Sequence, residues 1–183
     1  MFQKLYRLLF MFLWVLIPAT KIFVWLVMGK NYKIASDYIP FYYLGAVFQA
    51  FCSFYGVGYL RAKNTKGAFS SSIFGAVINA AINIGTIKLL GLHAAAVSTF
   101  ISFLGMWMIR EKQNRSELGI TISWKEFWLL LETDLLICIF SILGNIWFNL
   151  IFLILGTISF LIVNRKDFIT ILNTFKKKRD KKQ

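Results

Sequence analysis

Residues 76–110 read AVINAAINIGTIKLLGLHAAAVSTFISFLGMWMIR, two apolar segments joined at Gly91, Leu92 and His93. Each segment is close to the length of a bilayer-crossing helix, which takes roughly 20 apolar residues. Both segments also carry small and amide residues, which a helix surrounded only by lipid does not need. Such residues are typical of membrane helices that pack closely around a polar path. This stretch therefore predicts a helical membrane protein of the transport type.

The rest of the chain repeats the pattern of long apolar segments separated by short polar loops. Hydrophobic residues make up 58% of the 183 residues, more than a soluble domain of this length can bury, so lipid is the expected solvent. We predict an all-α, polytopic integral membrane protein with about six transmembrane helices. The expected spans are residues 8–28, 38–60, 68–90, 94–109, 124–143 and 146–163. Residues 1–164 form the transmembrane domain in this prediction, and residues 165–183 form a basic cytoplasmic tail.

Two local signals set the boundaries of the last spans. Ser123 and Glu126 fit a capping box at the start of the fifth span, with Glu126 reaching back to the first turn. Gly144 and Asn145 mark the expected turn before the sixth span, inside a run that is otherwise almost unbroken in its apolar character. Without this turn the count would fall to five spans.

Basic residues are distributed unevenly between the predicted loops. With six spans both termini lie on one side, which receives every Lys and Arg except Lys21, Lys30, Lys33 and Lys88. Because positively charged loops stay in the cytoplasm, we predict that both termini are cytoplasmic. Topology thus accounts for the net charge of +13, and we expect no nucleic-acid partner. The basic tail should attract anionic headgroups of membrane lipids.

Three consecutive spans each offer one small or polar face. Ser71, Gly75, Asn79 and Asn83 follow one another at intervals of four residues on the third span and therefore share a face. Gln49 lies on a comparable strip of the second span. Helix packing accounts for the glycines, whereas packing and the lining of an aqueous cavity explain the amides equally well.

Few ionisable residues lie inside the spans. Lys21 either extends to the outer interface or faces a cavity and attracts an anionic substrate. Glu132 and Asp134 suit the helix dipole near the start of the fifth span and are expected at the interface, with proton coupling as the lesser alternative. The single histidine cannot form a histidine-based metal cluster, and no nucleophile set or phosphate loop emerges. We predict no enzyme, no catalytic residue, no metal and no cofactor.

Four sequence features follow one another along residues 8–110 in an order that can be compared with known families. They are Met28-Gly29-Lys30-Asn31-Tyr32 followed by Ala35, then Tyr38-Ile39-Pro40, then the loop Lys63-Asn64-Thr65-Lys66, and last the block 76–110 with Asn79, Asn83, Gly91, Ala94, Ala95, Ala96, Thr99 and Arg110. Together they resemble the C-terminal part of bacterial polysaccharide and O-antigen flippases, in the multidrug/oligosaccharidyl-lipid/polysaccharide exporter superfamily. Lys88, Leu90 and His93 depart from the family pattern at the outer turn.

The resemblance implies transmembrane transport in the bacterial cytoplasmic (inner) membrane. Family members have two helical lobes around a central, partly cationic cavity and flip undecaprenyl-pyrophosphate-linked oligosaccharide for surface polysaccharide biosynthesis. This chain would supply the later helices, as a fragment or half of the transporter, with a missing N-terminal lobe as its partner. The substrate-path candidates are Lys21, Gln49, Asn79 and Asn83.

Three other readings stay open at this point. One is a drug or cation antiporter of the same superfamily, although the second to fourth spans lack the acidic residue that such proteins often carry. Another is a truncated membrane protein that transports nothing. A membrane glycosyltransferase or polymerase is disfavoured, because the predicted outer loops are too short to hold a catalytic site.

Overall fold

A computed structural model describes residues 1–28 and 34–180, with side chains described as far as Arg165. Over these residues the chain forms six α-helices: α1 (Phe2–Val27), α2 (Ala35–Arg61), α3 (Thr65–Leu90), α4 (Leu92–Leu118), α5 (Trp124–Leu143) and α6 (Ile146–Asp180). The all-helical prediction is confirmed. Lys30 and Lys33 of the charge comparison, and residues 29–32 of the family resemblance, lie outside the described residues.

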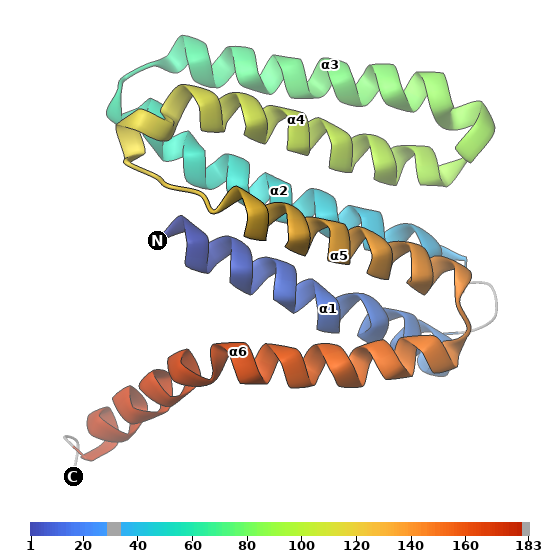
Figure 1. Ribbon diagram of the computed structural model, residues 1–183. Coiled ribbons are helices and arrows are strands. Elements are labelled where there is room, and N and C mark those ends of the chain that lie inside the picture. Colours follow the sequence, from blue (N-terminus) through green and yellow to red (C-terminus); the bar gives the residue numbers. More distant parts are fainter. Residues whose placement is uncertain (29–33, 181–183) are drawn as a thin grey trace.

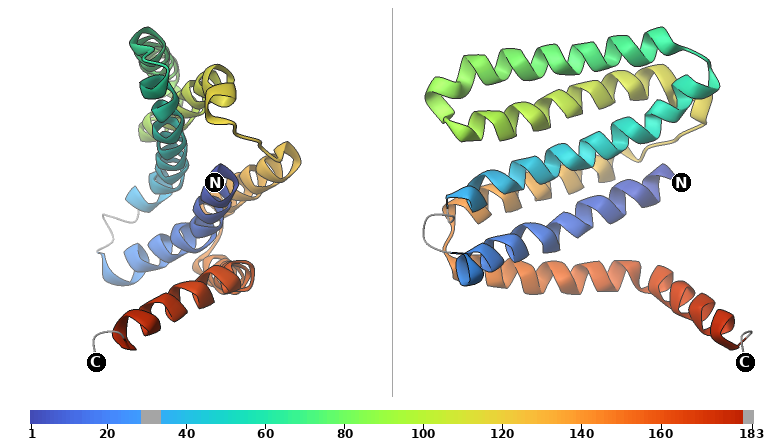
Figure 2. Two further views of the ribbon diagram at one scale, coloured as in Figure 1. Left: turned by 90° about the vertical axis from the view of Figure 1, so that its left-hand side faces the viewer. Right: turned by 180° about the vertical axis from the view of Figure 1, so that it is seen from behind.

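Consecutive helices along the chain run in opposite directions, and the six pack side by side in an open slab (Figure 1). Across the slab their order is α3, α4, α2, α5, α1 and α6, so that α3 and α6 are the two edges (Figure 1). Because direction alternates, the N-terminus and the C-terminal part of α6 lie at the same end, and this part of α6 bends away from the slab (Figure 2). The shared end of the termini agrees with the predicted six-helix arrangement.

Length and composition suit a membrane. Among the described residues, four helices are long and apolar enough to cross a bilayer: α1, α3, α4 and α6 as far as Arg165. α5 carries four charged residues among its apolar ones, Lys125, Glu126, Glu132 and Asp134. Both α2 and α5 lie in the interior of the slab, with neighbours on both sides (Figure 1). Crossing by all six helices, and the side on which the termini lie, stay predictions.

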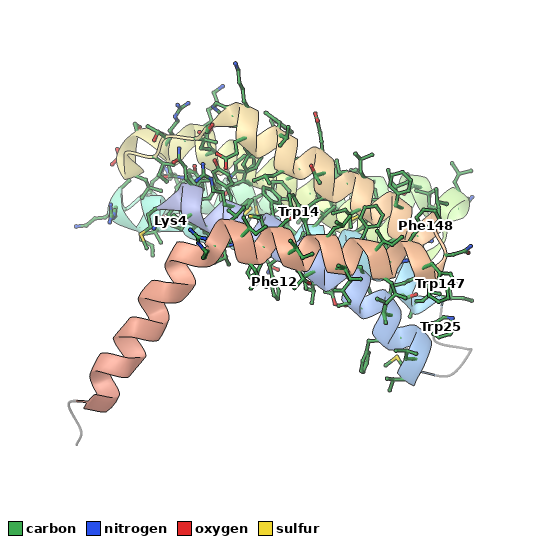
Figure 3. The ribbon with its side chains drawn as sticks, turned by 60° about the horizontal axis from the view of Figure 1, so that its bottom comes forward. Lys4, Phe12, Trp14, Trp25, Trp147 and Phe148 are labelled. Carbon is green, nitrogen blue, oxygen red and sulfur yellow. The ribbon has the colours of Figure 1, made fainter. Side chains whose placement is uncertain are left out.

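Exposed tryptophans gather at both ends of the slab. Trp25 and Trp147 lie at the end of the α5–α6 turn (Figure 3) and are 49% and 72% exposed. Trp124 and Trp128 lie in the first turns of α5, at the opposite end, and are 36% and 40% exposed. One helix of 20 residues separates the two levels, about 30 Å at 1.5 Å per residue, which is close to the thickness of a hydrocarbon core. Tryptophans at these two levels are typical of membrane–water interfaces.

Aromatic side chains join α1, α2, α4 and α5 near the end that holds the termini. Phe127 is fully buried at the centre, stacked on Trp107 with ring centroids 4.8 Å apart and edge-on to Phe10 at 5.3 Å. We call this cluster the aromatic core; its members are Phe2, Tyr6, Phe10, Phe48, Phe51, Tyr55, Trp107 and Phe127. Large rings packed edge to face fix the relative positions of these four helices.

α2 and α4 approach closely because of glycines. A Cβ at Gly45 would lie 3.2 Å from Thr99 Cγ2, and one at Gly58 would lie 2.6 Å from Asn114 Cβ. Small residues at such positions let membrane helices bring their backbones together. α2 and α4 therefore form a closely packed pair, and α3 packs against it, mainly on α4.

α4 and α6 extend farther than the sequence predicts, whereas the turn between α5 and α6 lies where it was expected. α4 continues past residue 109 to Leu118, where Gly119 ends it in the left-handed conformation with φ 58°. The turn at Gly144 is confirmed, since α5 ends at Leu143 and α6 begins at Ile146. The predicted tail is also helical as far as Asp180.

The prediction of a capping box at the start of α5 is wrong. Ser123 makes no side-chain cap hydrogen bond. The Glu126 carboxylate instead forms an ion pair with Arg7, accepting from Nη2 at 2.7 Å, and also accepts from the Tyr6 hydroxyl at 3.2 Å. A charged partner on α1 thus outcompetes the local backbone amide, because a bidentate guanidinium gives stronger hydrogen bonds.

Candidate functional site

A groove of about 450 Å³ runs between α3 and α4. Gly75 lets the two helices approach, since a Cβ there would lie 3.3 Å from Met106 Sδ. The lining residues are Ser72, Gly75, Ala76, Asn79, Ala80, Ser102, Phe103 and Met106. The groove therefore offers hydroxyl and amide groups along a path between apolar walls.

Asn79 is held in the middle of this groove by hydroxyls of α4. Its Nδ2 lies 3.4 Å from Thr99 Oγ1 and 3.3 Å from Ser102 Oγ. Both hydroxyls donate to carbonyls of their own helix, Thr99 to Ala95 O at 2.7 Å and Ser102 to Thr99 O at 2.9 Å, which leaves them as acceptors toward Asn79. The Asn79 amide oxygen has no hydrogen-bond partner in the described part of the chain and can accept from a ligand hydroxyl.

Arg110 closes the end of the groove nearest the chain termini. Its Nη1 donates to the Cys52 carbonyl of α2 at 2.8 Å, Nε to Ser71 Oγ of α3 at 3.1 Å, and Nη2 to Ser72 Oγ at 2.9 Å. Gly56, one turn beyond Cys52, leaves room for this reach, because a Cβ there would lie 3.5 Å from Nη1. One guanidinium thus ties three helices together beside a residue of the groove wall.

No carboxylate in the described part of the chain forms an ion pair with Arg110. Glu111, the next residue, is directed toward Arg115, with 3.7 Å between the charged atoms. A guanidinium has five N–H donors, of which three are used here, so two remain for an incoming acceptor. A fixed cation with spare donors and no protein counter-ion is suited to binding an anion.

The structure brings some of the predicted path residues together. Asn79 lines the groove, and Asn83 follows one turn farther along the same helix, half-buried, with an Oδ1 that has no hydrogen-bond partner in the described residues. Gln49 lies exposed on α2, one turn beyond Gly45, which faces Thr99. It therefore lies at about the same depth as the groove, on the neighbouring helix.

Lys21 lies elsewhere. It sits on α1, which is separated from α3 by α4 and α2 (Figure 1), and its ammonium forms an ion pair with Asp37 in the first turn of α2. The two side chains are only 18% and 30% exposed. Of the two roles considered for Lys21, the structure shows neither a free ammonium at the interface nor one that faces the groove.

The sequence analysis did not predict the positions of two residues, Arg110 beside the groove and Asp134 on α5. Arg110 counted as a loop charge and as part of the family pattern but not as a path residue, although it follows Met106 by one helical turn and so lies on the groove face. Asp134 was expected at the interface but is fully buried. A cation on the same face as a small, polar stripe was the available signal for Arg110; nothing local distinguished Asp134 from Glu132.

Comparison with known proteins finds no matching family model, no matching curated protein and no matching solved structure. The fold and the tryptophan levels place the chain in the class of helical proteins with apolar helices suited to a membrane. Any narrower assignment depends on the groove and on the resemblance described above.

Proposed function

We propose that this chain is part of a flippase for lipid-linked oligosaccharide in the bacterial cytoplasmic membrane. The observation that carries the proposal is Arg110, a cation without a carboxylate partner among the described residues, fixed at the end of a polar groove between apolar helices. An undecaprenyl-pyrophosphate-linked sugar has matching parts: a dianionic or more highly charged headgroup, many hydroxyls and a long apolar tail.

Each part of such a substrate has a complementary surface. The two spare Arg110 N–H groups can donate to pyrophosphate oxygens, which gives charge-assisted hydrogen bonds. The Asn79 amide oxygen can accept from a sugar hydroxyl. The outer side of α3 is apolar and exposed, with Phe69 at 69% and Val77 at 60% exposure, so that the lipid tail can stay in the bilayer while the headgroup enters the groove.

The open edges of the slab fit a role as one lobe of a larger transporter. α3 and α6 each have neighbours on one side only (Figure 2). A second lobe against the groove side would enclose the substrate path, while lipid would cover the remaining apolar surface. An N-terminal lobe, on the same chain or another, is the partner in this proposal.

A cation antiporter of the same superfamily is the second candidate. The observation in its favour is Asp134, which is fully buried in α5. Such an antiporter needs an interior acid, and the polar groove would then take a cationic drug. Arg110 argues against this alternative, because a fixed positive charge at the groove repels a cation.

Binding of three undecaprenyl lipids to the purified full chain tests the proposal. We expect affinity to fall in the order pyrophosphate, monophosphate, free alcohol. In Arg110→Gln the pyrophosphate affinity should fall at least about tenfold, because loss of charge-assisted hydrogen bonds is worth about 1.5–3 kcal/mol. Arg165→Gln removes an exposed cation of α6, far from the groove, and should change nothing. Equal affinity for the three lipids would exclude headgroup recognition.

A further inference from the structure

Asp134 is a buried acid that forms no ion pair in the described part of the chain. It lies ten residues into a helix of 20 residues, at the middle of α5, and none of its surface is exposed. Neither carboxylate oxygen has a hydrogen-bond partner in the described part of the chain. Its neighbour Glu132 is exposed on the opposite side of the same helix.

One buried donor of α1 lies near this carboxyl, on a helix that Pro18 interrupts. The Trp14 indole N–H lies near it, buried and without a hydrogen bond in the described residues. Pro18 lacks the N–H that would otherwise bind the Trp14 carbonyl four residues earlier, so α1 has a gap in its ladder at this level. Gly156 of α6 packs directly on that carbonyl, since a Cβ there would lie 2.5 Å from Trp14 O.

A cavity of about 270 Å³ lies beside this cluster, between α5 and α6. Trp14 and Gly156 form part of its wall, and Thr133 and Ser159 add hydroxyls. Figure 3 shows Trp14 at the place where α6 covers α1. Asp134 is not among the lining residues, and the lining is otherwise apolar, so this space brings no water to Asp134 in the packing seen here.

No charged side chain from the neighbouring helices faces Asp134. α1 has no charged residue in 8–20, α2 none in 38–60 and α6 none in 146–164. The titratable groups on the packed elements are the Cys138 thiol one turn away on α5, Tyr6 on α1, and on α2 Cys52 and the tyrosines. Arg7 and Lys21 of α1 already have partners, Glu126 and Asp37. A negative charge at Asp134 would thus have no cation beside it and only the neighbouring Trp14 indole N–H to accept from among these groups.

We propose that Asp134 is a proton-binding site, which carries its proton in the packing seen here and releases it to water when α1 and α6 separate at Pro18. An isolated carboxylate in apolar surroundings is so unfavourable that the group neutralises instead. Separation of α1 and α6 would open the Trp14 side of the site, and the proton would pass from the carboxyl oxygen to a water that enters there. The charge left behind then opposes reclosure until a proton returns.

In the context of transport, this step makes the proton the coupling ion, an assignment that rests on the proposed function. The proton exchange at Asp134 does not depend on the proposed function. A protein that binds no lipid pyrophosphate can still exchange a proton at Asp134, and a flippase can work without doing so. Each of the two proposals can therefore be contradicted without affecting the other.

Infrared spectroscopy of the full chain in lipid bilayers tests the proton site. Protonated carboxyl groups absorb apart from carboxylates, and an ordinary Asp, with a pKa of about 3.9 in peptides, is ionised at neutral pH. We expect a protonated-carboxyl band at neutral pH that Asp134→Asn removes and the matched control Glu132→Gln retains. The band should shift in deuterated buffer and decline reversibly as the pH is raised.

Two results would overturn the proposal: no band at neutral pH that depends on Asp134, or a band that neither exchanges in deuterated buffer nor responds to pH. The second result would mean a permanently neutral packing group. If Asp134→Asn does not fold, Asp134→Glu keeps the carboxyl and should shift the band instead of removing it. Lipid binding is measured on the same samples, so that a loss of binding is not mistaken for a loss of the proton site.

Discussion

At the scale of single residues, two cations near apolar helices have different roles because their neighbours differ. Lys21 has a carboxylate partner, Asp37, on the adjacent helix. Arg110 has hydroxyl and carbonyl partners and no carboxylate in the described residues. A cation paired with a carboxylate stabilises the packing of two helices, whereas one that lacks a counter-ion is suited to binding an anion. Lys21 was a substrate-path candidate from the sequence, because composition cannot show which charge finds a partner.

The Lys21–Asp37 pair should behave as a structural contact. Lys21→Gln leaves Asp37 as a lone carboxylate and should destabilise the protein by about 1–3 kcal/mol, while the double variant Lys21→Gln/Asp37→Asn should recover most of the loss. Thermal unfolding in detergent measures both. Normal stability of the single variant together with loss of lipid binding would contradict this view and return Lys21 to the substrate path.

At the scale of elements, the lengths of the apolar segments and the glycines at their ends were enough to predict all six helices. The turn at Gly144 and the break at Gly91 lie where the sequence places them. The extension of α4 to Leu118 could not be predicted from hydropathy, because its last two turns are polar. The Arg7–Glu126 pair joins residues 119 positions apart, so no local pattern could distinguish it from a capping box.

The α1–α6 contact depends on the missing side chain at Gly156. Gly156→Ala should lower stability by about 1–3 kcal/mol, because the added methyl group meets the backbone of Trp14 and not a mobile side chain. Gly85→Ala on α3 is the matched control, since a Cβ there meets nothing within 4 Å. It should be neutral or stabilising by up to about 1 kcal/mol. Equal effects of the two substitutions would show that α6 does not pack on α1 in this way.

At the scale of the whole molecule, the slab has two chemically different ends. The end that holds the termini carries the basic loops, and the other has the short turns at Gly91 and Gly144. Both native cysteines are buried, so an impermeant thiol reagent should report only introduced sites. Thr121→Cys should react from the cytoplasmic side and Asn145→Cys from the outside. Labelling of both from one side would contradict the six-span topology.

The groove lies at an open edge of the slab, and this position determines which preparation is suited to a transport assay. Because the groove lies next to an edge helix (Figure 1), the full path requires whatever lobe the cell provides. Under the proposed function, membrane vesicles from the source organism would keep such a partner, which a purified chain would lack. The groove variants and their control can be compared there at equal protein levels.

The most direct test is movement of fluorescent undecaprenyl-pyrophosphate-linked sugar between the leaflets of such vesicles. The account predicts that vesicles with the native chain move the lipid, that Arg110→Gln slows the movement at least about tenfold, since about 1.4 kcal/mol corresponds to that factor, and that Arg165→Gln does not. Equal rates for the native chain and Arg110→Gln would contradict the assignment of the groove as the substrate path.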